Sequence, residues 1–135
     1  MKRFISAWLI STISMLAVSY TWHGVILNDL RQVNYPEWYF FLLLCLTYSI
    51  IALIMTGVYQ FTLPKKNPVF RAAVLGGAFG FFLYLVAFTL GISFKSGAVE
   101  HVVVDFVWQM VEQGFGAVVV AWVFAFATRL QENFG

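Results

Sequence analysis

The chain has 135 residues, of which 61% are hydrophobic, 19% aromatic and only 10% charged, with a formal net charge of +2. Soluble domains carry about 25% charged residues, so this composition excludes an ordinary water-soluble domain. The basic residues lie in short polar segments without interleaved aromatic side chains, and no nucleic-acid partner is expected.

The first apolar segment runs from about residue 4 to residue 27, after the basic start Lys2-Arg3. At about 1.5 Å per residue, its length as a helix exceeds the ~30 Å of a hydrocarbon core. The small-x-small pattern Ala17-Val18-Ser19 leaves a cleaved signal peptide open as the alternative. Because the apolar character continues beyond Ser19, an uncleaved transmembrane span is favoured.

The second span is predicted from about residue 38 to residue 61, after a polar loop that holds Pro36 and Glu37. Tyr35 and Trp38 lie beside charged residues and are typical of an aromatic belt at a membrane interface. The lone Cys45 lies inside the apolar run, so neither a disulfide framework nor a thiolate metal site can be built within one chain.

The third span is predicted from about residue 70 to residue 94, after a loop that holds Pro64 and Pro68. Small residues spaced by four allow helix backbones to approach closely in a membrane. Four such residues occur in its first half and one in the fourth span, and we expect all of them at helix contacts: Ala73, Gly76, Gly77, Gly80 and Gly116.

The fourth span, from about residue 102 to residue 127, carries polar residues on one face. At ~100° per residue, Asp105, Gln109, Glu112 and Gly116 fall within roughly one quarter of the helix surface. An ionised carboxylate at a helix centre costs about 2.5–3.5 kcal/mol on insertion. We therefore expect Glu112 to face the bundle interior and to be paired, hydrated or protonated.

These segments predict that residues 1–135 form a single all-α domain, a polytopic membrane protein built as a four-transmembrane-helix bundle. Short loops on the N-terminal side would hold most of the basic residues, which are Lys2, Arg3, Lys65, Lys66, Arg71 and Arg129, against Arg31 and Lys95 on the other side. The positive-inside rule then places both termini in the cytoplasm.

A polar site is predicted in the outer, periplasm-facing half of this bundle. His23 lies near the outer end of the first span, at a depth similar to that of Asp105, and Glu112 lies about 10 Å deeper than Asp105. A pocket lined by His23, Asp105, Gln109 and Glu112 could bind or relay a proton, a cation or a small ligand. The apolar stretch 118–127 would seal the bundle beneath it.

Other chemistries are disfavoured. His23, His101, Glu100 and Asp105 lack the compact spacing of a metal site. Two histidines are the bare minimum for haem, and no serine or cysteine has a recognisable nucleophile context. We therefore expect no cofactor and no catalytic residue.

The alternative to the polar site is a structural or assembly subunit whose buried polar residues only fix helix packing. Beyond the lipid bilayer, a homo-oligomer or another membrane protein stays open as a partner.

Two short stretches carry a family resemblance. Trp22-His23-Gly24, followed by Asp29, ends the first span, and Asp105-Phe106-Val107-Trp108 opens the fourth. With the four-span layout, these residues resemble small four-span bacterial inner-membrane proteins of unknown function. The resemblance implies a bacterial inner-membrane location and brings no activity.

Overall fold

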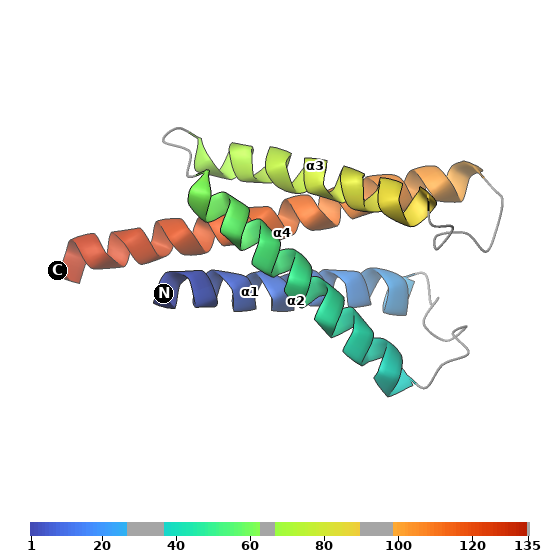
Figure 1. Ribbon diagram of the computed structural model, residues 1–135, viewed down its shortest axis with the longest axis horizontal. Coiled ribbons are helices and arrows are strands. Elements are labelled where there is room, and N and C mark those ends of the chain that lie inside the picture. The colour runs from blue at the N-terminus through green and yellow to red at the C-terminus, as the bar shows by residue number, and fades with distance from the viewer. Residues whose placement is uncertain (27–36, 63–66, 90–98, 135) are drawn as a thin grey trace.

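The computed structural model describes residues 1–26, 37–62, 67–89 and 99–134. In these ranges the chain forms α1 (Lys2–Ser19), continued by the π-helix η1 (Tyr20–Ile26), then α2 (Glu37–Phe61), α3 (Pro68–Thr89) and α4 (Val99–Phe134) (Figure 1). No strand occurs in the described ranges. The expected all-α four-helix bundle is confirmed.

Four segments are long and apolar enough to cross a membrane: Lys2–Ile26, Phe41–Phe61, Pro68–Val86 and Val103–Leu130. The chain is therefore a multi-pass membrane protein whose outer faces suit contact with the lipid bilayer. Residue 27 and residues 90–94 of the expected spans lie outside the described residues. The helix α4 exceeds its expected span of 102–127 at both ends, because Arg, Leu, Gln and Glu favour helix beyond the point where hydropathy falls.

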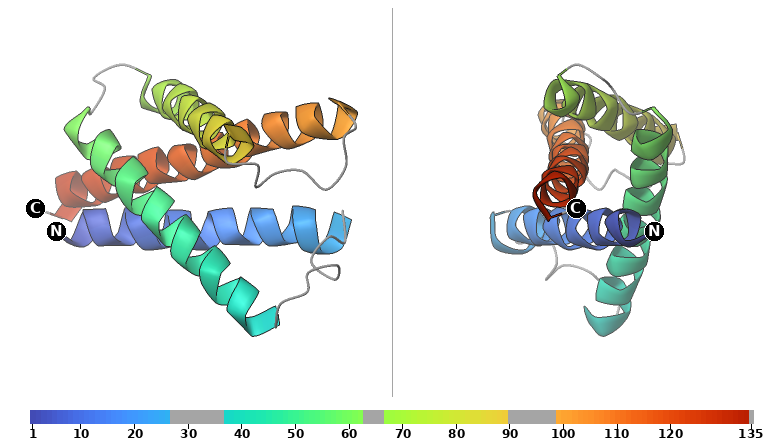
Figure 2. Two further views of the ribbon diagram at one scale, coloured as in Figure 1. Left: turned by 45° about the vertical axis from the view of Figure 1, so that its right-hand side comes forward. Right: turned by 90° about the vertical axis from the view of Figure 1, so that its left-hand side faces the viewer.

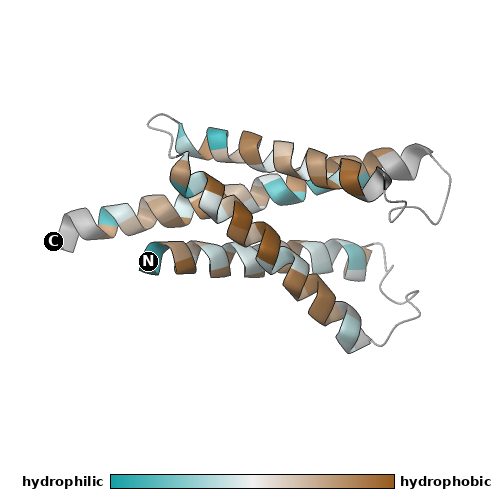
Figure 3. Cartoon of the chain, viewed as in Figure 1, coloured by the Kyte–Doolittle hydropathy of each residue, from teal (hydrophilic) through white to brown (hydrophobic). Residues whose placement is uncertain are grey.

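The helices run alternately up and down, and both chain ends lie at the same end of the bundle (Figure 1). The last helix, α4, is central, because it packs extensively against α3 on one side and α1 on the other. The second helix packs chiefly on α1, which it crosses obliquely (Figure 2). Hydrophilic colour interrupts α4 along the part that runs beside α3 (Figure 3). The polar residues of α4 therefore lie on the helix that packs against both α3 and α1.

The two helices that flank α4 each bury a row of every fourth residue. The row on α1 is Ala7, Ser11, Met15 and Ser19. The row on α3 is Ala72, Gly76, Gly80 and Tyr84. Residues spaced by four lie on one face of an α-helix, so each row forms a narrow seam.

The seam of α3 brings its backbone close to that of α4. A Cβ atom built on Gly80 would lie 2.5 Å from the carbonyl oxygen of Gln109, and one built on Gly76 would lie 2.7 Å from the Cβ atom of Ala117. Real Cβ atoms do not approach other atoms so closely, so only glycine fits at these two positions without a backbone shift. Gly76 and Gly80 therefore set the spacing of α3 and α4.

The other small residues at this contact, Ala73 and Gly77 of α3 and Gly114 of α4, are packed less tightly. A Cβ atom on Gly77 would meet only Met110 Cε, at 3.9 Å, and one on Gly114 would lie 3.6 Å from the carbonyl oxygen of Ala73. These are ordinary van der Waals distances. The close approach of α3 and α4 depends on the Gly76–Gly80 pair rather than on Ala73 and Gly77.

The α1 seam meets α4 at Gly116. A Cβ atom there would overlap the side chain of Met15, and the Ser11 hydroxyl donates to the Gly116 carbonyl oxygen over 3.0 Å. On another face of α1, the Trp8 indole N–H donates to the Ser49 carbonyl oxygen over 2.8 Å. These two bonds tie α1 to α4 and to α2.

Exposed aromatic side chains occur at the start of α2. Trp38 is 69% exposed and Tyr39 is 43% exposed, which suits the expected interfacial belt. Tyr35 lies outside the described residues. Trp22 of the first span packs against Trp108 of α4.

Candidate functional site

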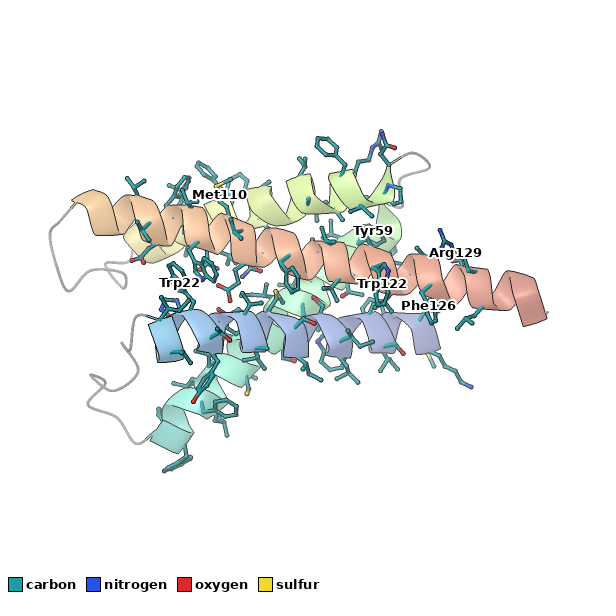
Figure 4. The ribbon with its side chains drawn as sticks, turned by 180° about the vertical axis from the view of Figure 1, so that it is seen from behind. Trp22, Tyr59, Met110, Trp122, Phe126 and Arg129 are labelled. Carbon is teal, nitrogen blue, oxygen red and sulfur yellow. The ribbon has the colours of Figure 1, made fainter. Side chains whose placement is uncertain are left out.

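The first element of the site is the π-helix η1, which continues α1 from Tyr20 to Ile26. Short π-helical turns are rare and occur frequently at functional sites. This one carries Trp22, whose ring stacks on Trp108 of α4 with centroids 4.0 Å apart and an interplanar angle of 12° (Figure 4). Neither buried indole N–H has a hydrogen-bond partner among the described residues. The two indole rings therefore contact each other by stacking, which packs η1 against α4.

Beside this stack lies a partly open pocket of about 370 Å³ to which all four helical segments contribute. Its lining residues are His23 from η1, Thr47 and Ile51 from α2, Leu83 and Tyr84 from α3, and Asp105, Trp108 and Gln109 from α4. Three of the four residues expected at a polar site, His23, Asp105 and Gln109, thus lie around one pocket. We refer to it as the polar pocket.

The fourth residue, Glu112, does not line the polar pocket. Its side chain is fully buried and lies beside the hydroxyl groups of Tyr48 and Ser19. Gln109, on the pocket wall, precedes it by three residues, about one helical turn. The site therefore has two levels, an accessible pocket and a buried carboxyl group one turn beneath it.

The hydrogen bonds that the described residues form around the buried carboxyl group of Glu112 do not include its own oxygen atoms. The Tyr48 hydroxyl donates to Ser19 Oγ over 2.7 Å, and neither oxygen of Glu112 completes a hydrogen bond within the described part of the chain. Both hydroxyl groups can rotate, and each can donate or accept. Tyr48 and Ser19 can therefore serve either the protonated or the charged form of Glu112.

Neither Tyr48 nor Ser19 was among the residues expected at the polar site. Ser19 is the last member of the buried α1 row Ala7-Ser11-Met15-Ser19, in which a methionine interrupts the small residues. Tyr48 lies in the apolar run of α2 and shares a face with Ala52 and Met55, both buried. Nothing in the sequence pairs that face with Glu112, because the pairing depends on how α2 crosses the bundle.

Polar groups also continue below Glu112. As expected, α4 buries apolar residues there, namely Val120, Ala121 and Val123. The neighbouring helices add the fully buried Ser11 and Thr56, and α4 itself adds the fully buried Gln113. The side-chain amide nitrogen and oxygen of Gln113 have no hydrogen-bond partner among the described residues. The same holds for the Thr56 hydroxyl. The apolar seal expected from α4 alone therefore contains polar side chains from three helices.

The described residues contain no group of three or more His, Cys, Asp or Glu side chains that could hold a metal ion. The side chains of Glu100 and His101, weighed above for metal and haem, lie outside the described set. Cys45 is a free, half-buried cysteine.

Comparison with protein-family models, with curated proteins and with solved structures finds no match for the chain. The stretches that carry the bacterial resemblance meet in the structure, since Trp22 stacks on Trp108, while Asp29 lies outside the described residues. The function of the protein is therefore inferred from the geometry of the two-level site.

Proposed function

We propose that the protein binds a proton at Glu112 and exchanges it with water through the polar pocket. The observation that carries the proposal is the position of Glu112: fully buried, without a completed hydrogen bond, and one turn below a pocket lined by His23 and Asp105. A carboxylate with no compensating charge is costly inside a membrane, and such residues mark ion or proton sites.

A proton suits this site better than a larger cation. Metal cations such as Ca²⁺ require six to eight oxygen ligands, whereas Glu112 is flanked by the two hydroxyl groups of Tyr48 and Ser19. A proton needs no such cage, and a hydroxyl group can accept the hydrogen bond of a protonated carboxyl. The proposed ligand is therefore the smallest of the three that the sequence left open.

The polar pocket would supply the access route. His23 lines the pocket with Asp105 and the hydroxyl-bearing Thr47 and Tyr84, and side chains of these types can donate and accept the hydrogen bonds of a proton relay. In the proposed orientation, this pocket faces the periplasm of a bacterium and both termini lie in the cytoplasm. The positive-inside distribution of basic residues supports that orientation.

Infrared spectroscopy of the purified protein in lipid bilayers tests the assignment. We expect a protonated-carboxyl stretching band at neutral pH that disappears in Glu112→Gln and persists in Asp105→Asn. The second variant removes a carboxyl group from the pocket wall and controls for effects on the bundle as a whole. Absence of the band from the wild type, or its persistence in Glu112→Gln, contradicts the proposal.

A second candidate function is a structural or assembly subunit. It is favoured by the direct links between helices, the Ser11–Gly116 bond and the Trp8–Ser49 bond. In that case Glu112 would be a buried packing residue without access to water. Isotope exchange at its carboxyl group separates the two functions, as set out at the end of the Discussion.

A further inference from the structure

A second and larger pocket lies at the end of the bundle that holds both termini. Its volume is about 710 Å³. It is lined by Met1, Lys2, Arg3 and Phe4 of the N-terminal segment, Tyr59 and Gln60 of α2, Pro68 of α3, and Phe124, Ala125, Thr128 and Arg129 of α4. We refer to it as the basic pocket. It lies at the opposite end of α1 from η1 and is separate from the polar pocket.

The charge of the basic pocket has one sign. Lys2, Arg3 and Arg129 are cationic, and no carboxylate stands among the described residues that line it. The Arg3 guanidinium donates to Thr128 Oγ1 over 3.4 Å, a long bond that engages one of its five donors. Figure 4 shows Arg129 on the last turns of α4. The pocket is therefore rich in donors suited to an anion.

Backbone groups add to this positive character. The helices α1 and α3 both begin at the pocket, at Lys2 and Pro68, and a helix N-terminus carries a partial positive charge. The N-cap residue of α1, Met1, makes no side-chain capping bond. The last turn of α2, with Tyr59 and Gln60, brings one negative helix end to the same pocket. Two positive helix ends against one negative end leave a positive contribution that adds to the three cationic side chains.

Apart from Gln60 and Thr128, the rest of the lining is apolar or aromatic, with Phe4, Tyr59 and Phe124 as its largest side chains. A soluble anion gains nothing from such a wall, whereas the glycerol and upper acyl chain of a lipid are well matched to it. Basic pockets between transmembrane helices bind anionic lipid headgroups. The combination of cations and apolar wall at the membrane surface favours a lipid over a free ion.

We propose that the basic pocket binds the phosphate group of an anionic membrane phospholipid, with Arg3 and Arg129 as its principal ligands. Arginine is suited to phosphate because its planar guanidinium presents donors in a fork. The shared chemistry is a phosphate group, and its two sources are a lipid headgroup and inorganic phosphate. This inference is independent of proton binding at Glu112.

Native mass spectrometry of the full chain in detergent tests the proposal with three probes: short-chain phosphatidylglycerol, short-chain phosphatidylcholine and inorganic phosphate. We expect the wild type to retain phosphatidylglycerol preferentially. The double variant Arg3→Gln/Arg129→Gln should weaken that binding about 25-fold, since each surface cation near an anionic headgroup contributes roughly fivefold. Arg71→Gln is the matched control, because Arg71 is an exposed cation at the start of α3 that does not line the basic pocket.

Three outcomes would overturn the inference. Equal losses in Arg71→Gln and the double variant would show attraction to surface charge in general rather than a site. Unchanged phosphatidylglycerol binding in the double variant would show that Arg3 and Arg129 do not bind the lipid phosphate. Binding of inorganic phosphate without binding of phosphatidylglycerol would assign the pocket to a soluble anion. Circular dichroism of each variant verifies that the helices are intact.

Discussion

Glu112 combines complete burial with incomplete hydrogen bonding, and its nearest polar partners come from two other helices. Tyr48 reaches it from α2 and Ser19 from α1. Gln113, the next residue, is equally buried but lies at the backbone contact with Gly76 of α3. Two adjacent polar residues of α4 therefore serve different interfaces: Gln113 lies at the contact with α3, and Glu112 lies beside Tyr48 and Ser19.

The Tyr48–Ser19 hydrogen bond gives a prediction at this scale. Tyr48→Phe removes the donor of the 2.7 Å bond and should lower the free energy of unfolding by roughly 0.5–1.5 kcal/mol, the usual net contribution of one hydrogen bond. Tyr20→Phe is the control, because Tyr20 is 53% exposed. Chemical unfolding in detergent measures both. Equal stability of Tyr48→Phe and the wild type would show that the bond contributes nothing.

The residues expected at the polar site were predictable only in part. Periodicity placed Asp105, Gln109 and Glu112 on one face of a helix, and depth matching selected His23. Ser19 and Tyr48 were not among the residues expected there, because a serine in a row of mostly small residues and a tyrosine in an apolar run carry no mark of their partner. Such a partner is fixed by the crossing of helices, which one sequence does not reveal.

Among the elements, α4 owes its central position to glycines on the α3 seam and on α4 itself. Gly76 and Gly80 admit α4 against α3, and Gly116 admits Met15 of α1. The sequence predicted close packing at these glycines from their spacing. It did not predict η1, because no residue type distinguishes a π-helical turn from a continued α-helix in the segment Tyr20–Ile26.

Alanine substitutions test the α3–α4 contact. Gly76→Ala would place a Cβ atom against the backbone of Gln113 and the side chain of Ala117, and overpacking of this kind costs about 1–3 kcal/mol. Gly57→Ala is the matched control in α2, where a Cβ atom meets nothing within 4 Å and helix propensity adds up to about 1 kcal/mol of stability. Thermal unfolding should show opposite shifts. A stable Gly76→Ala protein would refute the close contact.

For the whole molecule, hydropathy and loop polarity were sufficient to predict four helices, because membrane insertion imposes length and composition on each span. The oblique path of α2 was not predictable, since its apolar surface offers no periodic face that selects one neighbour. Both termini lie at one end of the bundle (Figure 1), as an even number of spans requires.

Reporter fusions test the proposed orientation. Green fluorescent protein fused to the C-terminus should fluoresce in a bacterial host, because it folds in the cytoplasm. Alkaline phosphatase fused after Lys95, between the third and fourth spans, should be active, because it requires the periplasm. The reverse pattern of reporter activity would show that the protein has the opposite orientation, with the polar pocket on the cytoplasmic side.

Proton access to Glu112 is the central claim, and hydrogen–deuterium exchange of its carboxyl band tests it most directly. We expect the band assigned by Glu112→Gln to shift promptly on transfer to deuterated buffer. The shift should be slower in Gln109→Leu, which removes an amide from the pocket wall, and unchanged in Val111→Leu, whose side chain is 53% exposed on the outer face. A carboxyl band that stays unshifted in the wild type for hours would contradict the account and leave Glu112 a packing residue.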